Sequence, residues 1–132
     1  MAEVVLRGEC MCGKVRYEVE GPPEWVGNCH CSLCRRHHGA AYGTYAGYRP
    51  ERFRVTAGQE ELRSYSHTGE TRRQFCATCG SSLFFLDADP PREIAITLGT
   101  LTDDPGKRPE FHYLASCKAS WHEITDDLPR RE

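Results

Sequence analysis

The sequence predicts a mostly β protein with at most short helical turns. Residues 14–20 alternate strictly, so Val15, Tyr17 and Val19 would share one face of a strand and leave charged side chains on the other. Turn residues recur at short intervals, as in Ala57-Gly58 and Thr68-Gly69. No long stretch has the apolar period of an amphipathic helix. Short strands joined by tight turns therefore account for most of the chain.

The remaining elements follow from the same patterns. Apolar and aromatic residues predict further strands over residues 43–48, 52–55, 71–75, 82–86 and 93–98. One short helical turn is expected after Cys31, through residues 34–38, and Gly39 would end it. Among single residues, Trp121 is expected to anchor the core, and Tyr42, Tyr45 and Tyr48 to fill the core or line a pocket wall.

Composition limits the class of protein. At 132 residues and a net charge of −2, the chain is expected to form a single domain over residues 1–132. The near-neutral balance argues against nucleic-acid binding, and the basic pairs Arg72-Arg73 and Arg130-Arg131 are expected to be solvated. Residues 1–10 lack the pattern of a leader peptide, and no apolar run could span a membrane. We therefore expect a soluble, cytoplasmic protein.

The cysteines carry the strongest functional signal. In a reducing compartment, eight cysteines in so short a chain indicate metal binding or catalysis and not a disulfide framework. Cys76 and Cys79 form a Cys-x-x-Cys turn followed by glycine, which aims two sulfurs at one ion. Cys10 and Cys12, two apart in a strand, would share a face. The two pairs together predict one closed, tetrahedral four-thiolate site, which is typical of structural zinc.

A second group of cysteines has a different count. Cys29, Cys31 and Cys34 supply three thiolates and leave a fourth position open, which is typical of catalytic zinc. Alternatively, one group is vestigial, or the seven ligands are shared differently between the sites. The eighth cysteine, Cys117, is expected to pack as a small buried side chain.

Three cysteine blocks follow one another along the chain. They are the runs GECMCGKVRY (8–17), CHCSLCRR (29–36) with Gly39-Ala40, and FCATCGSSL (75–83), followed by ITLGTLTDDP (96–105) and by Trp121 ahead of DLPR (127–130). These runs resemble those of the glutathione-dependent formaldehyde-activating enzyme family, whose domain is shared with centromere protein V. The resemblance extends over nearly the whole chain.

The resemblance implies a tent-like, zinc-binding fold of several short antiparallel sheets. It implies a structural zinc on Cys10, Cys12, Cys76 and Cys79 and a second, exchangeable zinc on Cys29, Cys31 and Cys34. The implied activity is a carbon–sulfur lyase type of reaction, in which formaldehyde and glutathione form S-hydroxymethylglutathione. The expected partner is a small thiol or its aldehyde adduct.

Three further residues are candidates for the chemistry. His37 and His38 lie one turn past Cys34, where either could donate a proton or bind the metal, and Arg35 could contact a substrate carboxylate. The alternative interpretation is that these three side chains are solvated in a surface turn and take no part in the chemistry. His30 lies between two proposed ligands and is expected to point away from the metal and to be structural.

Three function classes remain open on the sequence. The first is a zinc-dependent lyase acting on a thiol adduct, and the open three-cysteine site favours it. The second is a zinc-stapled binding module without catalysis. The third is a thiol-redox enzyme with Cys117 as nucleophile, on the related zinc β fold of the methionine sulfoxide reductases, although no Arg-x-Cys-x-Asn motif surrounds Cys117.

Overall fold

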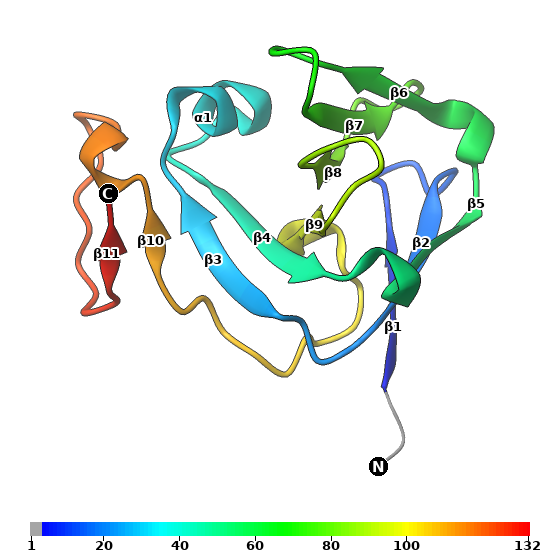
Figure 1. The fold of residues 1–132 in the computed structure, drawn as a ribbon, viewed down its shortest axis with the longest axis horizontal. Helices are drawn as coiled ribbons and strands as arrows, with labels where there is room; N and C mark the ends of the chain where they lie inside the picture. Colours follow the sequence, from blue (N-terminus) through cyan, green and yellow to red (C-terminus); the bar gives the residue numbers. More distant parts are fainter. Residues whose placement is uncertain (1–3) are drawn as a thin grey trace.

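Two β-sheets form the fold in the computed structural model, which describes residues 4–132. Residues 1–3, part of the segment considered above for a leader peptide, lie outside the described residues. The smaller sheet is antiparallel and has the order β1-β2-β5, with β1 at Val5–Glu9, β2 at Arg16–Glu20 and β5 at Phe53–Ala57. β2 therefore lies in the middle of this sheet, which is on the right of Figure 1.

The larger sheet of the described residues has the order β11-β10-β3-β4-β9-β8-β7-β6. Its strands from β3 to β6 are antiparallel, whereas β10 is parallel to both β3 and β11. Figure 1 shows β10 and β11 at one edge and the β6–β7 hairpin at the other. The bounds are β3 Trp25–Cys29, β4 Gly43–Tyr48, β6 Leu62–Tyr65, β7 Arg72–Cys76, β8 Ser82–Leu86, β9 Ile94–Thr97, β10 His112–Tyr113 and β11 Arg130–Arg131.

The core lies where the two sheets face each other. Tyr17 of β2 packs edge-on against Phe84 of β8, with ring centroids 5.0 Å apart, and Phe53 of β5 lies 4.8 Å from the same ring. The Tyr17 hydroxyl lies 2.8 Å from the hydroxyl of Thr100, so its polar end has a partner. This aromatic group joins the alternating face of β2 to the larger sheet.

Helical structure is short in the described residues. The α-helix α1 spans Ser32–His38, and the four 3₁₀ turns are η1 at Pro50–Arg52, η2 at Gln59–Glu61, η3 at Leu98–Thr100 and η4 at Ala115–Cys117. Cys31 caps the start of α1, because its sulfur accepts from the backbone N–H of Cys34. Gly39 ends the helix in the left-handed conformation, as predicted. Within residues 4–132, no helix has the length and apolar character needed to cross a bilayer.

The mostly β prediction is confirmed, and so are the strands with clear alternation. β4 and β8 have the predicted bounds, whereas β2, β5, β7 and β9 are shifted or shortened by one or two residues. β1, β3, β6, β10 and β11 were not predicted. In β3 three consecutive residues, Val26, Gly27 and Asn28, are buried, so the strand shows no alternation.

Two predictions about single residues are wrong. Trp121 is 72% exposed and does not anchor the core. Cys117 is exposed at the end of η4 and is not buried packing. Both residues lie in the irregular segment between β10 and β11, where no sheet covers them. The tyrosine prediction holds for Tyr45 and Tyr48, which are buried in β4.

Two glycines with positive φ give a matched test of backbone packing. At Gly58 (φ 78°) a Cβ would lie 2.1 Å from the backbone oxygen of Lys14, whereas at Gly69 (φ 89°) it would meet nothing within 4 Å. Both Gly→Ala changes cost conformational strain of about 1 kcal/mol. Gly58→Ala adds a clash with the Lys14 backbone, just before β2. We therefore expect it to lower the free energy of unfolding by about 2 kcal/mol more than Gly69→Ala does. Urea denaturation measures the difference, and equal losses would contradict the packing at Gly58.

Candidate metal centres and cavity

The first cysteine cluster joins the two sheets. Cys10 and Cys12 lie in the turn that follows β1, and Cys76 and Cys79 lie at the end of β7 and in the turn before β8. The prediction that Cys10 and Cys12 share the face of a strand is therefore wrong. The turn closes with a hydrogen bond from the Gly13 N–H to the Cys10 carbonyl, and Gly13 has a φ of 80°. A tight turn, and not a pleat, brings the two sulfurs together.

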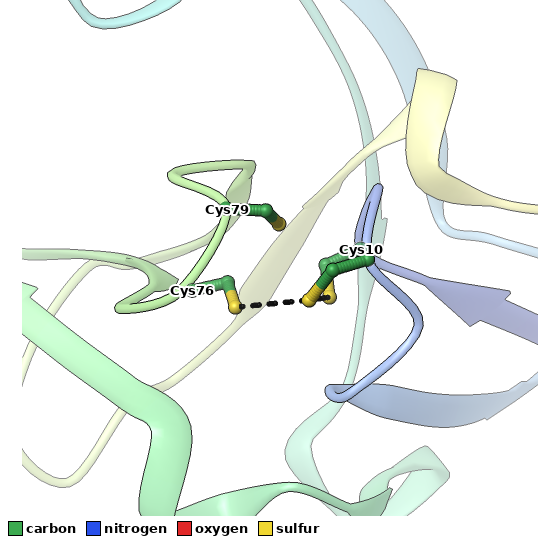
Figure 2. A group of neighbouring side chains, drawn as sticks. Cys10, Cys76 and Cys79 are labelled. Atoms are coloured by element: carbon green, nitrogen blue, oxygen red, sulfur yellow. Dashed lines mark hydrogen bonds between the residues drawn. The ribbon is translucent and has the colours of Figure 1, made fainter.

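The spacing of these sulfurs suits a tetrahedral ion. All four lie within 4.8 Å of one another, with 3.6 Å between Cys10 and Cys12 and 3.8 Å between Cys12 and Cys76. A zinc ion with Zn–S bonds of about 2.3 Å requires sulfurs about 3.8 Å apart. Figure 2 shows Cys76 and Cys79 directed from their turn toward Cys10. Hydrogen bonding from Ser81 lowers the pKa of Cys79 to about 5, which favours the thiolate that metal binding requires.

The second cluster is formed by one short stretch of chain. Cys29 ends β3, Cys31 caps α1 and Cys34 lies in its first turn, and their sulfurs lie within 4.8 Å of one another. Contacts with the Cys29 and Cys34 thiols and the N–H of Cys34 lower the pKa of Cys31, whereas contacts with the Cys31 and Cys34 thiols raise the pKa of Cys29. These three donors also fit a metal that keeps a free position, since within residues 4–132 no fourth ligand joins the group.

A buried arginine faces this second cluster. Both terminal nitrogens of Arg73, in β7, lie 3.7 Å from the Cys34 sulfur, and one lies 3.4 Å from the Tyr45 hydroxyl. Arg73 is only 9% exposed, so the prediction of a solvated Arg72-Arg73 pair is wrong for Arg73. In the described part of the chain no carboxylate pairs with it. Its charge is therefore directed at the thiol cluster and the space beside it.

Tyr45 and His38 extend the same network. The Tyr45 hydroxyl donates its one proton to the Cys34 sulfur over 3.4 Å, so His38 Nε2, at 2.8 Å, must be a donor to the Tyr45 oxygen. Burial lowers the pKa of His38 to about 4, and the charges of His37 and Arg73 add to this effect. His38 is therefore neutral near pH 7, and its hydrogen bond to Tyr45 connects it to the cluster.

His30 points into a different network, behind the cysteines. It is fully buried, and its Nε2 lies 2.8 Å from Nδ1 of His112, whose Nε2 lies 3.0 Å from the Asp126 carboxylate. The carboxylate requires a proton on His112 Nε2, so His30 Nε2 donates to His112. Burial lowers the pKa of His30 to about 4, with the charge of His112 contributing. This chain connects the cysteine loop to β10 and to the segment before β11.

A cavity of about 720 Å³ opens onto the three-cysteine cluster. Its walls come from β3, β4, β8, β9, β10 and β11, and Arg73 of β7 also lines it. Cys29, Cys31 and Cys34 all line the cavity, together with aromatic side chains. The four-cysteine cluster does not line this cavity. Only the open cluster can therefore meet a ligand bound there.

Arg35, His37 and His38 do not line the cavity. Arg35 donates to the His30 carbonyl over 3.4 Å, and the His37 carbonyl accepts from Ser82. The roles predicted for these three residues remain predictions. Arg73 was not predicted as a site residue, because as one of two adjacent arginines it was expected to be solvated. Its place in an alternating strand was the available signal, because one residue of two adjacent strand residues faces inward.

Comparison with known proteins identifies the family of this chain. The sequence model described as "Glutathione-dependent formaldehyde-activating enzyme" matches residues 5–116. A Halomonas elongata protein named "Putative glutathione-dependent formaldehyde-activating enzyme" is 30% identical over 129 residues, which cover 92% of this chain and 82% of that protein. A crystal structure of a Rhodobacter sphaeroides protein superposes with a TM-score of 0.64 at 32% identity, over 79% of this chain and 98% of that one. The chain belongs to the glutathione-dependent formaldehyde-activating enzyme family.

Proposed function

We propose that the protein is a zinc-dependent enzyme of the carbon–sulfur lyase type, which makes or breaks the adduct of a thiol and a small aldehyde. The observation that carries this proposal is the cavity of about 720 Å³, whose lining includes the three clustered cysteines. We assign a structural zinc to Cys10, Cys12, Cys76 and Cys79, and an exchangeable zinc to Cys29, Cys31 and Cys34. The donor sets fit these roles, because four thiolates close a tetrahedron and three leave it open.

Zinc at the open cluster would supply a Lewis acid that holds a thiol deprotonated and polarises an aldehyde oxygen. The cavity walls bring the thiol sulfur and the carbonyl carbon together, which makes their encounter local. A sulfur–carbon bond then forms as the carbonyl π bond breaks, and the proton lost by the thiol ends on the oxygen. The reverse reaction releases the aldehyde and the thiol.

Arg73 and Tyr45 are the protein groups best placed to assist. The Arg73 guanidinium stabilises negative charge on the reacting oxygen, because it is buried and has no carboxylate partner in the described residues. Burial, and then the neighbouring Cys34, raise the pKa of Tyr45, so its hydroxyl keeps its proton near pH 7. Tyr45 can therefore donate to Cys34 and hold that sulfur in place.

The cavity favours an enzyme over the two alternatives. A binding module needs no pocket on its metal ligands, whereas three of the seven clustered cysteines line one here. A thiol-redox enzyme would need Cys117 near a substrate pocket, and Cys117 does not line the cavity. The matching family and its named relative also point to formaldehyde and a thiol as reactants.

The activity has a direct test. Thiol and formaldehyde also combine without a catalyst, so we would measure their exchange with the adduct by NMR exchange spectroscopy at equilibrium. The zinc-loaded protein is expected to raise the exchange rate in proportion to its concentration. Protein loaded only at the four-cysteine cluster serves as the control. Equal exchange rates with and without the loaded protein, for glutathione and for simple thiols, would contradict the proposed function.

Loss of the four-cysteine cluster is expected to impair folding, whereas loss of the three-cysteine cluster is expected to impair catalysis. Cys76→Ser opens the cluster that joins the sheets, and a structural zinc can contribute on the order of 10 kcal/mol of apparent binding energy, so this variant should fail to fold stably. Cys31→Ser should stay folded, lose about one zinc per chain and lose catalysis. Circular dichroism and metal analysis measure both effects. Equal loss of structure in the two variants would show that the division of roles is wrong.

Arg73 and Arg72 are adjacent in β7 and give a matched pair of variants. Arg73→Met removes the charge beside Cys34, so we expect adduct exchange to slow by about 10- to 100-fold and the zinc affinity of the open cluster to change. Arg72→Met removes a charge that lies 3.6 Å from Asp89, and it should change the rate by less than about twofold. Similar rates for the two variants would exclude the role given to Arg73.

A further inference from the structure

We propose that the thiol used at the open cluster has an apolar body that fills the cavity and a far end without a carboxylate, and that glutathione binds more weakly than such a thiol. This inference rests on the proposed function and specifies its substrate. It follows from how size, apolar surface and charge are distributed along the cavity.

The cavity is much larger than the reacting atoms need. Its volume of about 720 Å³ is in the range of pockets that hold organic ligands of tens of atoms. It extends along β3, because Cys29 and Trp25, at opposite ends of that strand, both line it. Four residue steps of a strand span about 13 Å. A ligand that places its sulfur at Cys29 therefore has room for a body directed toward Trp25.

The walls between these ends are apolar. Phe85 of β8 and Ala95 of β9 are opposite one another in neighbouring strands, and Phe111 covers Gly27 of β3. All four residues line the cavity. A Cβ at Gly27 would lie 2.6 Å from the Phe111 ring, so the glycine is what lets this ring lie against the strand. An aromatic or aliphatic body would bury its surface against these side chains.

Negative charge gathers at the Trp25 end. Glu24 precedes Trp25, the Trp25 indole N–H donates to Glu93, and Glu110 accepts from the N–H of Val26. Asp87 accepts from the backbone N–H of Glu93 over 3.3 Å. All four carboxylates line the cavity. Burial raises the pKa of Glu93, and the charges of Asp87 and Glu24 act in the same direction, which agrees with a negative potential there.

The cations near these carboxylates lie outside the cavity lining. Arg49 pairs with Glu24 at 3.1 Å, Arg92 with Asp87 at 3.3 Å and Lys107 with Glu110 at 3.5 Å, and none of the three cations lines the cavity. They reduce the negative charge but offer no contact to a ligand inside.

Positive charge lies at the cysteine end and in the middle of the cavity. Arg73 faces Cys34 at the cysteine end. The Arg131 guanidinium stacks on the Phe111 ring, 4.0 Å from its centroid, and therefore lies over the middle of β3 and not among the carboxylates at the Trp25 end. The cavity therefore suits a ligand with an anionic reacting end and an uncharged or cationic far end. Glutathione carries two carboxylates and one ammonium group, so its net charge is negative near pH 7, and either of its ends would bring a carboxylate toward the like charge at the Trp25 end.

Cobalt bound at the open cluster gives a readout that does not depend on catalysis. A thiol that adds a further sulfur changes the ligand-field bands of the cobalt ion, and a titration then gives a dissociation constant. We would compare glutathione, 2-mercaptoethanol and three phenylmethanethiols that carry a methyl, an aminomethyl or a carboxylate group in the para position.

The methyl and aminomethyl compounds should bind at least about tenfold more tightly than 2-mercaptoethanol, because each buries an aromatic ring. The carboxylate compound should bind about tenfold more weakly than the methyl compound, and glutathione should bind no more tightly than 2-mercaptoethanol. Tighter binding of glutathione than of all three aromatic thiols would overturn this inference and leave the proposed function intact. If no thiol changes the spectrum, the proposed function itself fails, and the inference with it.

Variants locate the effect in the cavity. Ala95→Leu narrows the apolar part of the cavity and should abolish the preference for the aromatic thiols, while the dissociation constant of 2-mercaptoethanol stays unchanged. If this variant folds poorly, Phe85→Ala is the second variant. Glu24→Gln should improve binding of the carboxylate compound by about threefold. Its matched control is Glu51→Gln, because Glu51 is exposed on η1 and does not line the cavity. Equal effects of the two glutamine variants would also contradict the inference.

Discussion

The four cysteine sulfurs gathered between the two sheets are the constraint on which the rest of the fold depends. Cys10 and Cys12 follow the first strand of the small sheet, and Cys76 and Cys79 belong to the β7–β8 turn of the large one. Cys10 and Cys76 are themselves part of the buried core. Thiols this close repel one another once they ionise, so they gain from an ion that holds them together. In a chain of 132 residues, such a link supplements a small core.

The three-cysteine cluster makes no such link. Its three cysteines lie within six consecutive residues, Cys29 to Cys34, in which β3 ends and α1 begins. The loop is held from behind by the chain from His30 through His112 to Asp126, and from the side by Tyr45 and Arg73. The residues of the histidine chain do not line the cavity, whereas Tyr45 and Arg73 hold the cluster from within its lining. We therefore expect that this cluster can lose a bound ion or change a fourth ligand without loss of the fold.

Much of this arrangement could be predicted from the sequence, and the exceptions have physical reasons. Cysteine spacing predicted both clusters, because local turns bring neighbouring sulfurs together, and the two separate pairs supply the four donors of a closed site. Strands exposed on one face, such as β2, show alternation, whereas β3 is buried on both faces and shows none. Trp121 was expected in the core on residue type alone, but no sheet covers its segment. Arg73 was missed because its burial depends on Cys34 and Tyr45, which are distant in sequence.

Zinc K-edge X-ray absorption of the fully loaded protein tests the central claim, that one zinc is closed by four sulfurs and another is left open by three. Seven protein sulfurs shared between two ions predict an average between three and four sulfurs per zinc, with a lighter atom completing the coordination. Adding a thiol that binds the open site should bring the average to four. A single zinc per chain with four sulfurs, or an average of four before any thiol is added, would contradict the account.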